Sequence, residues 1–175
     1  VPFNKGVTTI TWTATDASGN SETCSYTLTV TDGENPNAIC KVAPVLLERD
    51  GTATVLPAAI DNNSTDNCGI VTYQISKSEL TGYGSSISFD CNDIGGNTAW
   101  LKVIDADGNF SVCSTTIDID DTQAPTLDDL SDRNVVVDNA VCTYTHTDDL
   151  WNPTDNCDLS PIISYTLSGV TTVVT

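Results

Sequence analysis

The chain has 175 residues, with 24 acidic and six basic side chains and a formal net charge of −18. This balance excludes nucleic acid as a natural partner, because phosphate binding needs a basic surface. No apolar run approaches the roughly 20 residues that cross a bilayer, so no membrane insertion is expected. The acidic surface serves either to keep the protein soluble or to attract divalent cations, and both readings stay open.

The first predicted element is a β-hairpin built from residues 8–15 and 25–30. Both runs are rich in β-branched and aromatic side chains that alternate with period two. Between them, Asp16-Ala17-Ser18-Gly19-Asn20 supplies a carboxylate that can bond its own backbone and a glycine that tolerates a left-handed conformation. Trp12 and Trp100 occur in strands that precede such turns, where core or half-buried packing is favoured over stacking on a sugar.

The middle of the chain predicts several short strands and a second hairpin. The strands are expected at 38–47, 51–56, 70–76 and 85–90, with one helical turn at 58–60 and the hairpin at 98–104 and 110–117. Six or seven short strands separated by turn residues are typical of an immunoglobulin-like β-sandwich. The predicted fold class is therefore all-β, with tandem sandwiches of about seven strands each, stapled by disulfides.

An internal repeat of 89 residues organises the chain. The first hairpin recurs in the second, with Gly6 matching Gly95, Cys24 matching Cys113 and Pro36 matching Pro125. Asp66-Asn67-Cys68 recurs at the same spacing as Asp155-Asn156-Cys157. Such a period indicates a tandem array, sampled here as repeat one (1–35), repeat two (36–121) and repeat three (122–175). Joining the tail to the head makes one plausible complete repeat, which predicts a two-repeat module that recurs in a longer protein.

The residues of the first hairpin resemble a known family. Phe3 to Asn20, followed by Cys24-Ser25-Tyr26, is similar to the hyalin repeat (HYR) and to related immunoglobulin-like repeats of giant surface adhesins from Bacteroidetes-type bacteria. The resemblance implies that 1–35 is the C-terminal part of an HYR-like unit, 36–121 a complete unit with four cysteines, and 122–175 the N-terminal part of a further HYR-like unit. It also implies an extracellular module, often exported by the type IX pathway, and it carries over no catalytic residues.

Seven cysteines predict disulfides and an oxidising location. The resemblance implies a bridge between the opening strand and the strand after the second turn, and the remaining cysteines are then assigned within their own repeats. The predicted bridges are Cys40–Cys113, Cys68–Cys91 and Cys142–Cys157. Cys24 is left over, either as a free buried thiol or as a covalent link between neighbouring chains.

Acidic residues at the second turn and in the linkers are the candidate metal ligands. Carboxylate oxygens are the donors that Ca²⁺ prefers, and acidic linkers can be stiffened by it. The alternative is that Asp and Asn occur there for turn chemistry alone. The candidates are Asp105 and Asp107 on the turn, and Asp32, Glu34, Asp120 and Asp121 in the linkers.

The expected function is that of a non-catalytic structural or adhesive segment of a long surface protein or filament. The expected partners are neighbouring repeats, other copies of the chain, and a surface glycan or protein. One histidine, His146, is too few for a His-based triad or zinc site, so no enzyme activity is expected. Two alternatives stay open. One is a carbohydrate- or protein-binding module that uses loops around 78–86, and the other is a spacer attached to a secreted enzyme.

Overall fold

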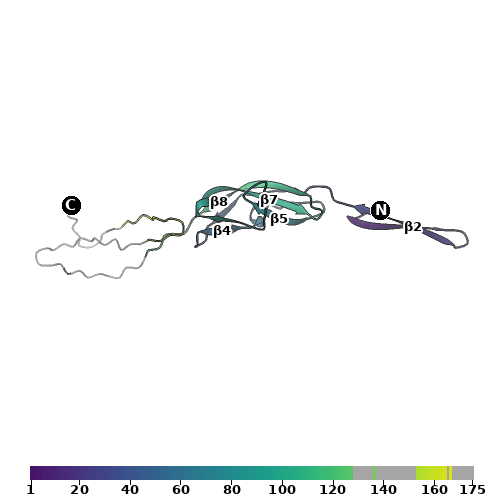
Figure 1. The fold of residues 1–175 in the computed structure, drawn as a ribbon, viewed down its shortest axis with the longest axis horizontal. Coiled ribbons are helices and arrows are strands. Elements are labelled where there is room, and N and C mark those ends of the chain that lie inside the picture. Colours follow the sequence, from purple (N-terminus) through teal and green to yellow (C-terminus); the bar gives the residue numbers. More distant parts are fainter. Residues whose placement is uncertain (128–135, 137–152, 165, 167–175) are drawn as a thin grey trace. The chain divides into compact units, whose positions relative to one another are not determined.

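The computed structural model describes residues 1–127, 136, 153–164 and 166 (Figure 1). Strands form nearly all of the regular structure in this part of the chain, which confirms the all-β class. The exceptions are the single helical turn α1 (Pro57–Ile60), as predicted, and the 3-10 turn η1 (Cys91–Asp93). Among the described residues, no helix has the length and apolar character needed to cross a membrane.

The chain is divided into two compact units. The first contains Val1–Ala43, Val55–Ile87 and Asn97–Ile117, and the second contains Pro44–Thr54, Ser88–Gly96 and Asp118–Thr175. These boundaries differ from the predicted repeats, because three separate segments of the chain contribute to each unit.

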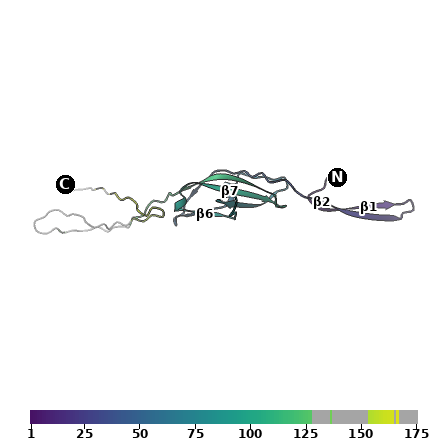
Figure 2. The ribbon, with the colours of Figure 1, turned by 45° about the horizontal axis from the view of Figure 1, so that its top comes forward.

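The predicted first hairpin is present as β1 (Gly6–Thr15) and β2 (Ser21–Val30). The two strands pair antiparallel without interruption, from Gly6 opposite Val30 to Thr15 opposite Ser21. They form a two-stranded sheet of their own (Figure 2). Gly19 in the connecting turn has a φ of 86°, a left-handed conformation that favours glycine.

Repeat two contains the remaining strands. A four-stranded sheet has the order β3 (Ala43–Leu46), β8 (Phe110–Asp120), β7 (Gly95–Asp105) and β5 (Ile70–Ser76), and a two-stranded sheet pairs β4 (Thr52–Val55) with β6 (Ile87–Asp90). The predicted strand at 38–47 is shorter than expected. The segment before β3 makes only isolated bridges, between Asn37 and Thr65 and between Cys40 and Asp61.

Period-two alternation places the apolar side chains of these strands in the core. Ala99, Leu101 and Val103 on β7 are fully buried, as are Ile117 and Ile119 on β8. Further buried residues come from β4, β5 and β6, namely Ala53, Val55, Ile75, Ile87 and Phe89. Asp105 continues the alternation of β7 and is only 4% exposed. The end of β7 therefore carries a carboxylate into a buried position.

Two disulfides occur among the described residues. Cys40–Cys113 is present as the resemblance implies, with 5.9 Å between the Cα atoms. The second disulfide joins Cys91 to Cys157, across 66 residues of sequence. It replaces the predicted Cys68–Cys91 and Cys142–Cys157 bridges, which are therefore corrected. Cys142 itself lies outside the described residues.

The local packing explains this second pairing. Cys91 Sγ lies 3.3 Å from the carbonyl oxygen of Asn156, the residue next to Cys157. A Cβ added to Gly51 would lie 2.8 Å from Cys91 Sγ, so this glycine leaves room for the bridge. Cys68 is instead exposed in the first compact unit and has no disulfide partner.

Two predictions about the first hairpin are wrong for a common reason. Cys24 is free, as one alternative held, but it is exposed where a buried thiol was expected. Trp12 is 63% exposed where packing was expected, whereas Trp100 on β7 is half-buried. Both errors arise because no third strand pairs with β1 or β2 in the described structure.

Candidate metal centre

Three aspartates from separate segments meet in the first compact unit. Asp32 lies in the linker after β2, Asp66 in the loop before β5, and Asp105 at the end of β7. One carboxylate oxygen from each lies within 4.8 Å of the others. Asp105 is buried, and Asp32 and Asp66 are half-buried. Three negative charges at this spacing repel one another, so the arrangement favours a bound cation.

Unsatisfied oxygen atoms identify where such a cation would bind. Oδ2 of Asp32 and Oδ1 of Asp66 are buried and accept no hydrogen bond. Leaving buried polar atoms without partners is costly, and native proteins do so rarely. A divalent cation would satisfy both oxygens at once. This is the observation that turns a cluster of acidic residues into a candidate metal centre.

The turn after β7 holds the third carboxylate in place. Asp105 Oδ1 accepts hydrogen bonds from the backbone N–H of Asp107 at 2.9 Å and of Asn109 at 2.8 Å. Its Oδ2 accepts one from Asn109 Nδ2 at 2.7 Å. Burial acts to raise the pKa of Asp105, but the hydrogen bonds from Asn109 and from the turn backbone hold this pKa below its ordinary value. The carboxylate is therefore charged at neutral pH, as a metal ligand must be.

The linker is tied to the same turn by direct hydrogen bonds. Asn109 Nδ2 also donates to the backbone oxygen of Asp32 at 3.1 Å. The backbone N–H of Asp32 donates to Asp107 Oδ2, again at 3.1 Å. Both polar groups of the Asp32 backbone are thereby used, and the side-chain Oδ1 of Asp32 accepts the backbone N–H of Glu34 at 3.1 Å.

Two of the predicted ligands have other roles in the first compact unit. Asp107 forms an ion pair with Lys5, with 2.6 Å between Nζ and Oδ2, and this contact raises the pKa of Lys5. Glu34 accepts a hydrogen bond from Asn67 Nδ2 at 2.7 Å. Asp107 and Glu34 therefore each take part in a hydrogen bond between the linker and repeat two.

The other two predicted ligands lie in the second compact unit, outside the cluster. Asp120 is exposed. Asp121 accepts hydrogen bonds from the backbone of Gln123 at 3.0 Å and from Asn156 Nδ2 at 3.3 Å. The cluster thus contains the predicted Asp32 and Asp105 together with Asp66, which was not among the predicted ligands. The recurrence of Asp66-Asn67-Cys68 as Asp155-Asn156-Cys157 could have identified it.

The chemistry of this donor set fits a hard cation such as Ca²⁺, which takes six to eight oxygen ligands. It offers no activated nucleophile. The nearby Asp32 carboxylate raises the pKa of the Cys68 thiol. A raised thiol pKa disfavours the thiolate that covalent catalysis requires.

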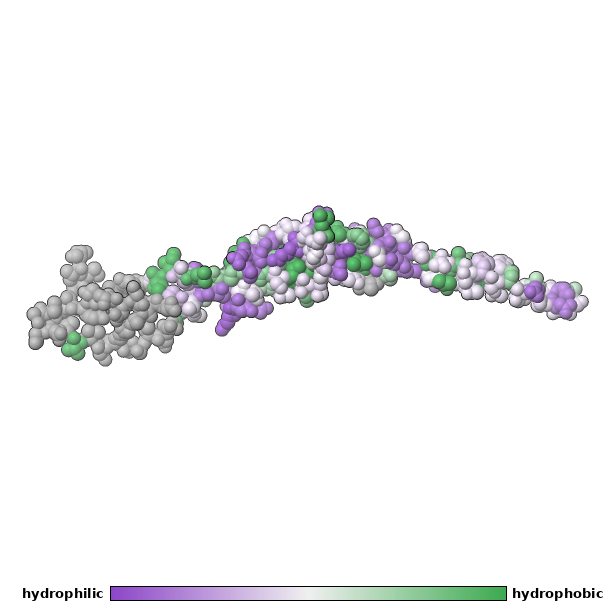
Figure 3. Space-filling model, viewed as in Figure 1, coloured by the Kyte–Doolittle hydropathy of each residue, from purple (hydrophilic) through white to green (hydrophobic). Residues whose placement is uncertain are grey.

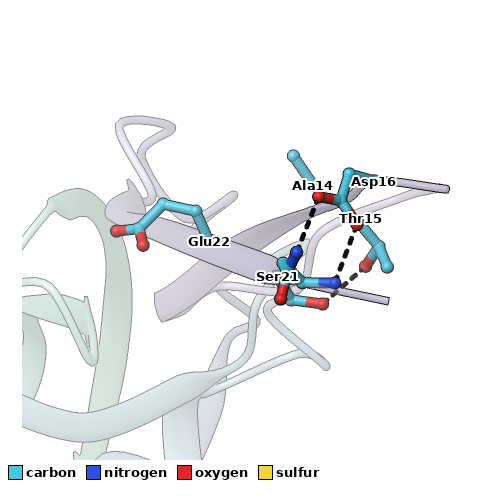
Figure 4. Close-up of a pocket in the computed structure, with 6 residues that line it drawn as sticks. Ala14, Thr15, Asp16, Ser21 and Glu22 are labelled. Carbon is cyan, nitrogen blue, oxygen red and sulfur yellow. Dashed lines mark hydrogen bonds between the residues drawn. The ribbon is translucent and has the colours of Figure 1, made fainter. Parts of the chain in front are cut away.

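A shallow hollow at the tip of the first hairpin is the other surface feature of interest. It is lined by Ala14, Thr15, Asp16, Asn20, Ser21 and Glu22. Figure 4 shows the Glu22 side chain extending away from Asp16, so the two carboxylates do not converge. The hollow therefore lacks the clustered ligands found at Asp105.

Comparisons with known proteins add no relative. No protein-family model matches the chain. No curated protein matches it either.

Proposed function

We propose that the chain is a non-catalytic structural segment of a long extracellular surface protein or filament. HYR-like, immunoglobulin-like β-sandwich repeats follow one another, and Ca²⁺ bound by Asp32, Asp66 and Asp105 fixes the junction between repeats one and two. The observation that carries this proposal is the pair of buried, unpartnered oxygens on Asp32 and Asp66. Cell-surface location, adhesion and type IX export follow from the family resemblance.

The origin of the three ligands supports a role at the junction. Asp32 belongs to the linker, whereas Asp66 and Asp105 belong to repeat two. A cation shared among them would hold the linker against the loop before β5 and the turn after β7. Without it, repulsion among the three carboxylates would loosen the same contact. Stiffness would then depend on calcium, as suits a segment whose role is to project or connect.

The disulfides support an extracellular setting. Two bridges in a small β-rich protein indicate an oxidising environment, since thiols stay reduced in the cytosol. An acidic surface adds solubility in such a setting. Figure 3 shows hydrophilic residues spread over much of the coloured surface. Neighbouring repeats are the first partners, and a surface glycan or protein would be bound elsewhere on the array.

Calcium titration of the protein and of two matched variants tests this proposal. Asp66→Asn removes one ligand, and Asp118→Asn removes the same charge from an exposed position on β8. We expect Asp66→Asn to weaken calcium binding by at least about tenfold, because affinity follows the charged-ligand count. Asp118→Asn should bind as the parent does. Hydrogen exchange should show that the amides of residues 32–35 lose protection when calcium is chelated.

Two results would contradict the proposal. One is the absence of calcium binding by calorimetry together with unchanged amide exchange at 32–35 on chelation. The other is an equal loss of affinity in both variants, which would mean that calcium responds to net charge and not to this cluster.

A further inference from the structure

The segments Asp66-Asn67-Cys68 of repeat two and Asp155-Asn156-Cys157 of repeat three, here called the Asp-Asn-Cys loops, have the same local structure. In each loop the aspartate accepts the backbone N–H of the cysteine, at 2.8 Å in repeat two and 2.9 Å in repeat three. The residue before each aspartate exchanges two backbone hydrogen bonds with the residue that follows the linker proline. These pairs are Thr65 with Asn37 and Thr154 with Thr126, with N–O distances of 2.7 to 3.1 Å. Each loop is therefore held beside the linker that precedes its own repeat.

The asparagine of each loop also contacts the preceding linker. Asn67 Nδ2 donates to the Glu34 carboxylate at 2.7 Å, and Asn156 Nδ2 donates to Asp121 Oδ1 at 3.3 Å. Asn156 Nδ2 donates in addition to the backbone oxygen of Glu48 at 3.3 Å, so the second loop reaches the body of repeat two as well as its linker. The Asp-Asn-Cys loop thus contacts the end of the preceding repeat at both junctions.

The second junction is closed by a covalent bond. Cys157 of the loop is joined to Cys91 of repeat two, with 5.3 Å between the Cα atoms. Gly51 lies beside this bond with a φ of 74°, and a Cβ on it would lie 2.8 Å from Cys91 Sγ and 3.0 Å from the backbone oxygen of Asn156. A residue without a side chain is needed for so close an approach. The end of repeat two therefore provides a docking surface that fits the loop of the next repeat.

The first junction has the same loop without the covalent bond. Cys68 is the counterpart of Cys157, but it is exposed and free. The residue 89 positions before Cys91 is Pro2, which carries no thiol. The loop at this junction therefore keeps its contacts to the linker, whereas the partner for its cysteine is replaced.

The start of repeat one nevertheless lies close to this loop. Lys5 Nζ is 2.6 Å from Asp107 Oδ2, and the same oxygen accepts the backbone N–H of Asp32 at 3.1 Å. Asp32 in turn shares the three-aspartate cluster with Asp66, the first residue of the loop. Pro2 is three residues before Lys5, so a side chain at position 2 is within reach of the loop.

We infer that the Asp-Asn-Cys loop is the docking element between successive repeats, and that the residue at the position of Cys91 in the preceding repeat decides how the junction is closed. A cysteine there closes it with a disulfide, as between repeats two and three. Pro2 leaves the junction between repeats one and two to the three-aspartate cluster, and this half of the inference rests on the proposed function. An array of such repeats would contain links that respond to reductant and links that respond to a chelator.

Removing the covalent bond tests the second junction. The double variant Cys91→Ser with Cys157→Ser deletes the bond, and the matched control Cys24→Ser with Cys68→Ser deletes the two free thiols. Hydrogen exchange is followed in saturating calcium. In the first variant, protection of the two paired backbone amides next to the loop of repeat three should fall by at least about tenfold, because the bond no longer holds the loop in place. The control should retain this protection, and the amides of residues 32–35 should be unchanged in both.

Introducing the missing cysteine tests the first junction. In a Cys24→Ser background, Pro2→Cys should form a disulfide with Cys68 when oxidised glutathione is added. The two protein thiols lose two protons and two electrons, and the glutathione disulfide takes them up as two thiols. Ser18→Cys in the same background is the matched control, because this exposed turn lies at the opposite end of β1 and should give no bond to Cys68. Once position 2 is bonded, chelation should no longer lower the protection of residues 32–35.

Two results would overturn the inference. One is peptide mapping of the parent protein that finds Cys157 bonded within its own repeat and not to Cys91. The other is a yield of the bond to Cys68 that is no higher in Pro2→Cys than in Ser18→Cys. Calcium binding weakened in Asp66→Asn but retained in Asp118→Asn would keep the proposed function in either case. A bond that forms in Pro2→Cys without any calcium binding by the parent would support docking by the loop and contradict the proposed function, so the two failures are distinguishable.

Discussion

The β1–β2 and β7–β8 hairpins have closely similar strands and the same turn but differ in what surrounds them. One is a two-stranded sheet with an exposed Trp12, and the other lies inside a four-stranded sheet where Leu101 is fully buried. The comparison teaches that the turn and strand pairing are encoded locally, whereas burial is supplied by other parts of a repeat. It also separates hairpin stability from core stability within one molecule.

The largest expected effect comes from removing the disulfide that only the second hairpin has. Cys40→Ser opens a bridge that closes 73 residues and should lower the free energy of unfolding of repeat two by about 4 kcal/mol. Denaturant unfolding measures this loss. Cys24→Ser at the matching position should leave stability unchanged, and an equal loss there would contradict the comparison.

Truncating matched core positions gives the next largest effect. Leu101→Ala should cost about 3 kcal/mol, because it leaves a cavity in a packed core. Trp12→Ala should change the stability of the monomer by less than about 0.5 kcal/mol, since exposed substitutions seldom do more. Thermal unfolding at low protein concentration compares them. Similar losses would show that Trp12 is packed in solution.

Calcium should distinguish the two turns. At 100 times its dissociation constant, a ligand that binds only the folded state stabilises it by about 2.7 kcal/mol. Asp105→Asn should abolish this gain, whereas Asp16→Asn should retain it, because only Asp105 belongs to the three-aspartate cluster. Differential scanning calorimetry with calcium and with a chelator measures both. If Asp16→Asn also lost the stabilisation by calcium, the cation would bind at a site other than the three-aspartate cluster.

Acid should affect both turns alike, and this is the smallest effect. Hydrogen bonds from Asn20 hold the pKa of Asp16 below its ordinary value of 3.8, and the pKa of Asp105 is lowered as well. A carboxylate with a lowered folded pKa stabilises the fold above its unfolded pKa, and this contribution is lost as pH falls through the folded value. Without calcium, the protection of the amides in both turns, relative to their intrinsic exchange rates at the same pH, should therefore fall below about pH 4. A change in one turn only would contradict their equivalence.

Local features were predictable from the sequence. Alternating β-branched residues located both hairpins, and the predicted 70–76 coincides with β5 (Ile70–Ser76). The proline that opens α1 and the turn glycines are likewise local features. Such elements depend on neighbouring residues, so a single sequence contains what is needed to find them.

Long-range pairings were not predictable in the same way. Cys91 joins Cys157 and not Cys68, because the choice depends on which loops meet in space and on the room left by Gly51. Asp66 was missed for the same reason, since its approach to Asp32 is set by the fold and not by spacing. The 89-residue repeat contained part of this information, but repeat one has Pro2 in the place of Cys91.

The two disulfides also determine how the chain would respond to a pulling force. Their loops interlock, because Cys91 lies between Cys40 and Cys113, and Cys113 lies before Cys157. Between Cys40 and Cys157 a stretched chain can extend only through the segment from Cys91 to Cys113. At about 3.5 Å per residue these 22 residues yield roughly 75 Å, against about 400 Å for the whole span without bridges. The two disulfides would thus limit the stretched span from Cys40 to Cys157 to about a fifth of its length without bridges.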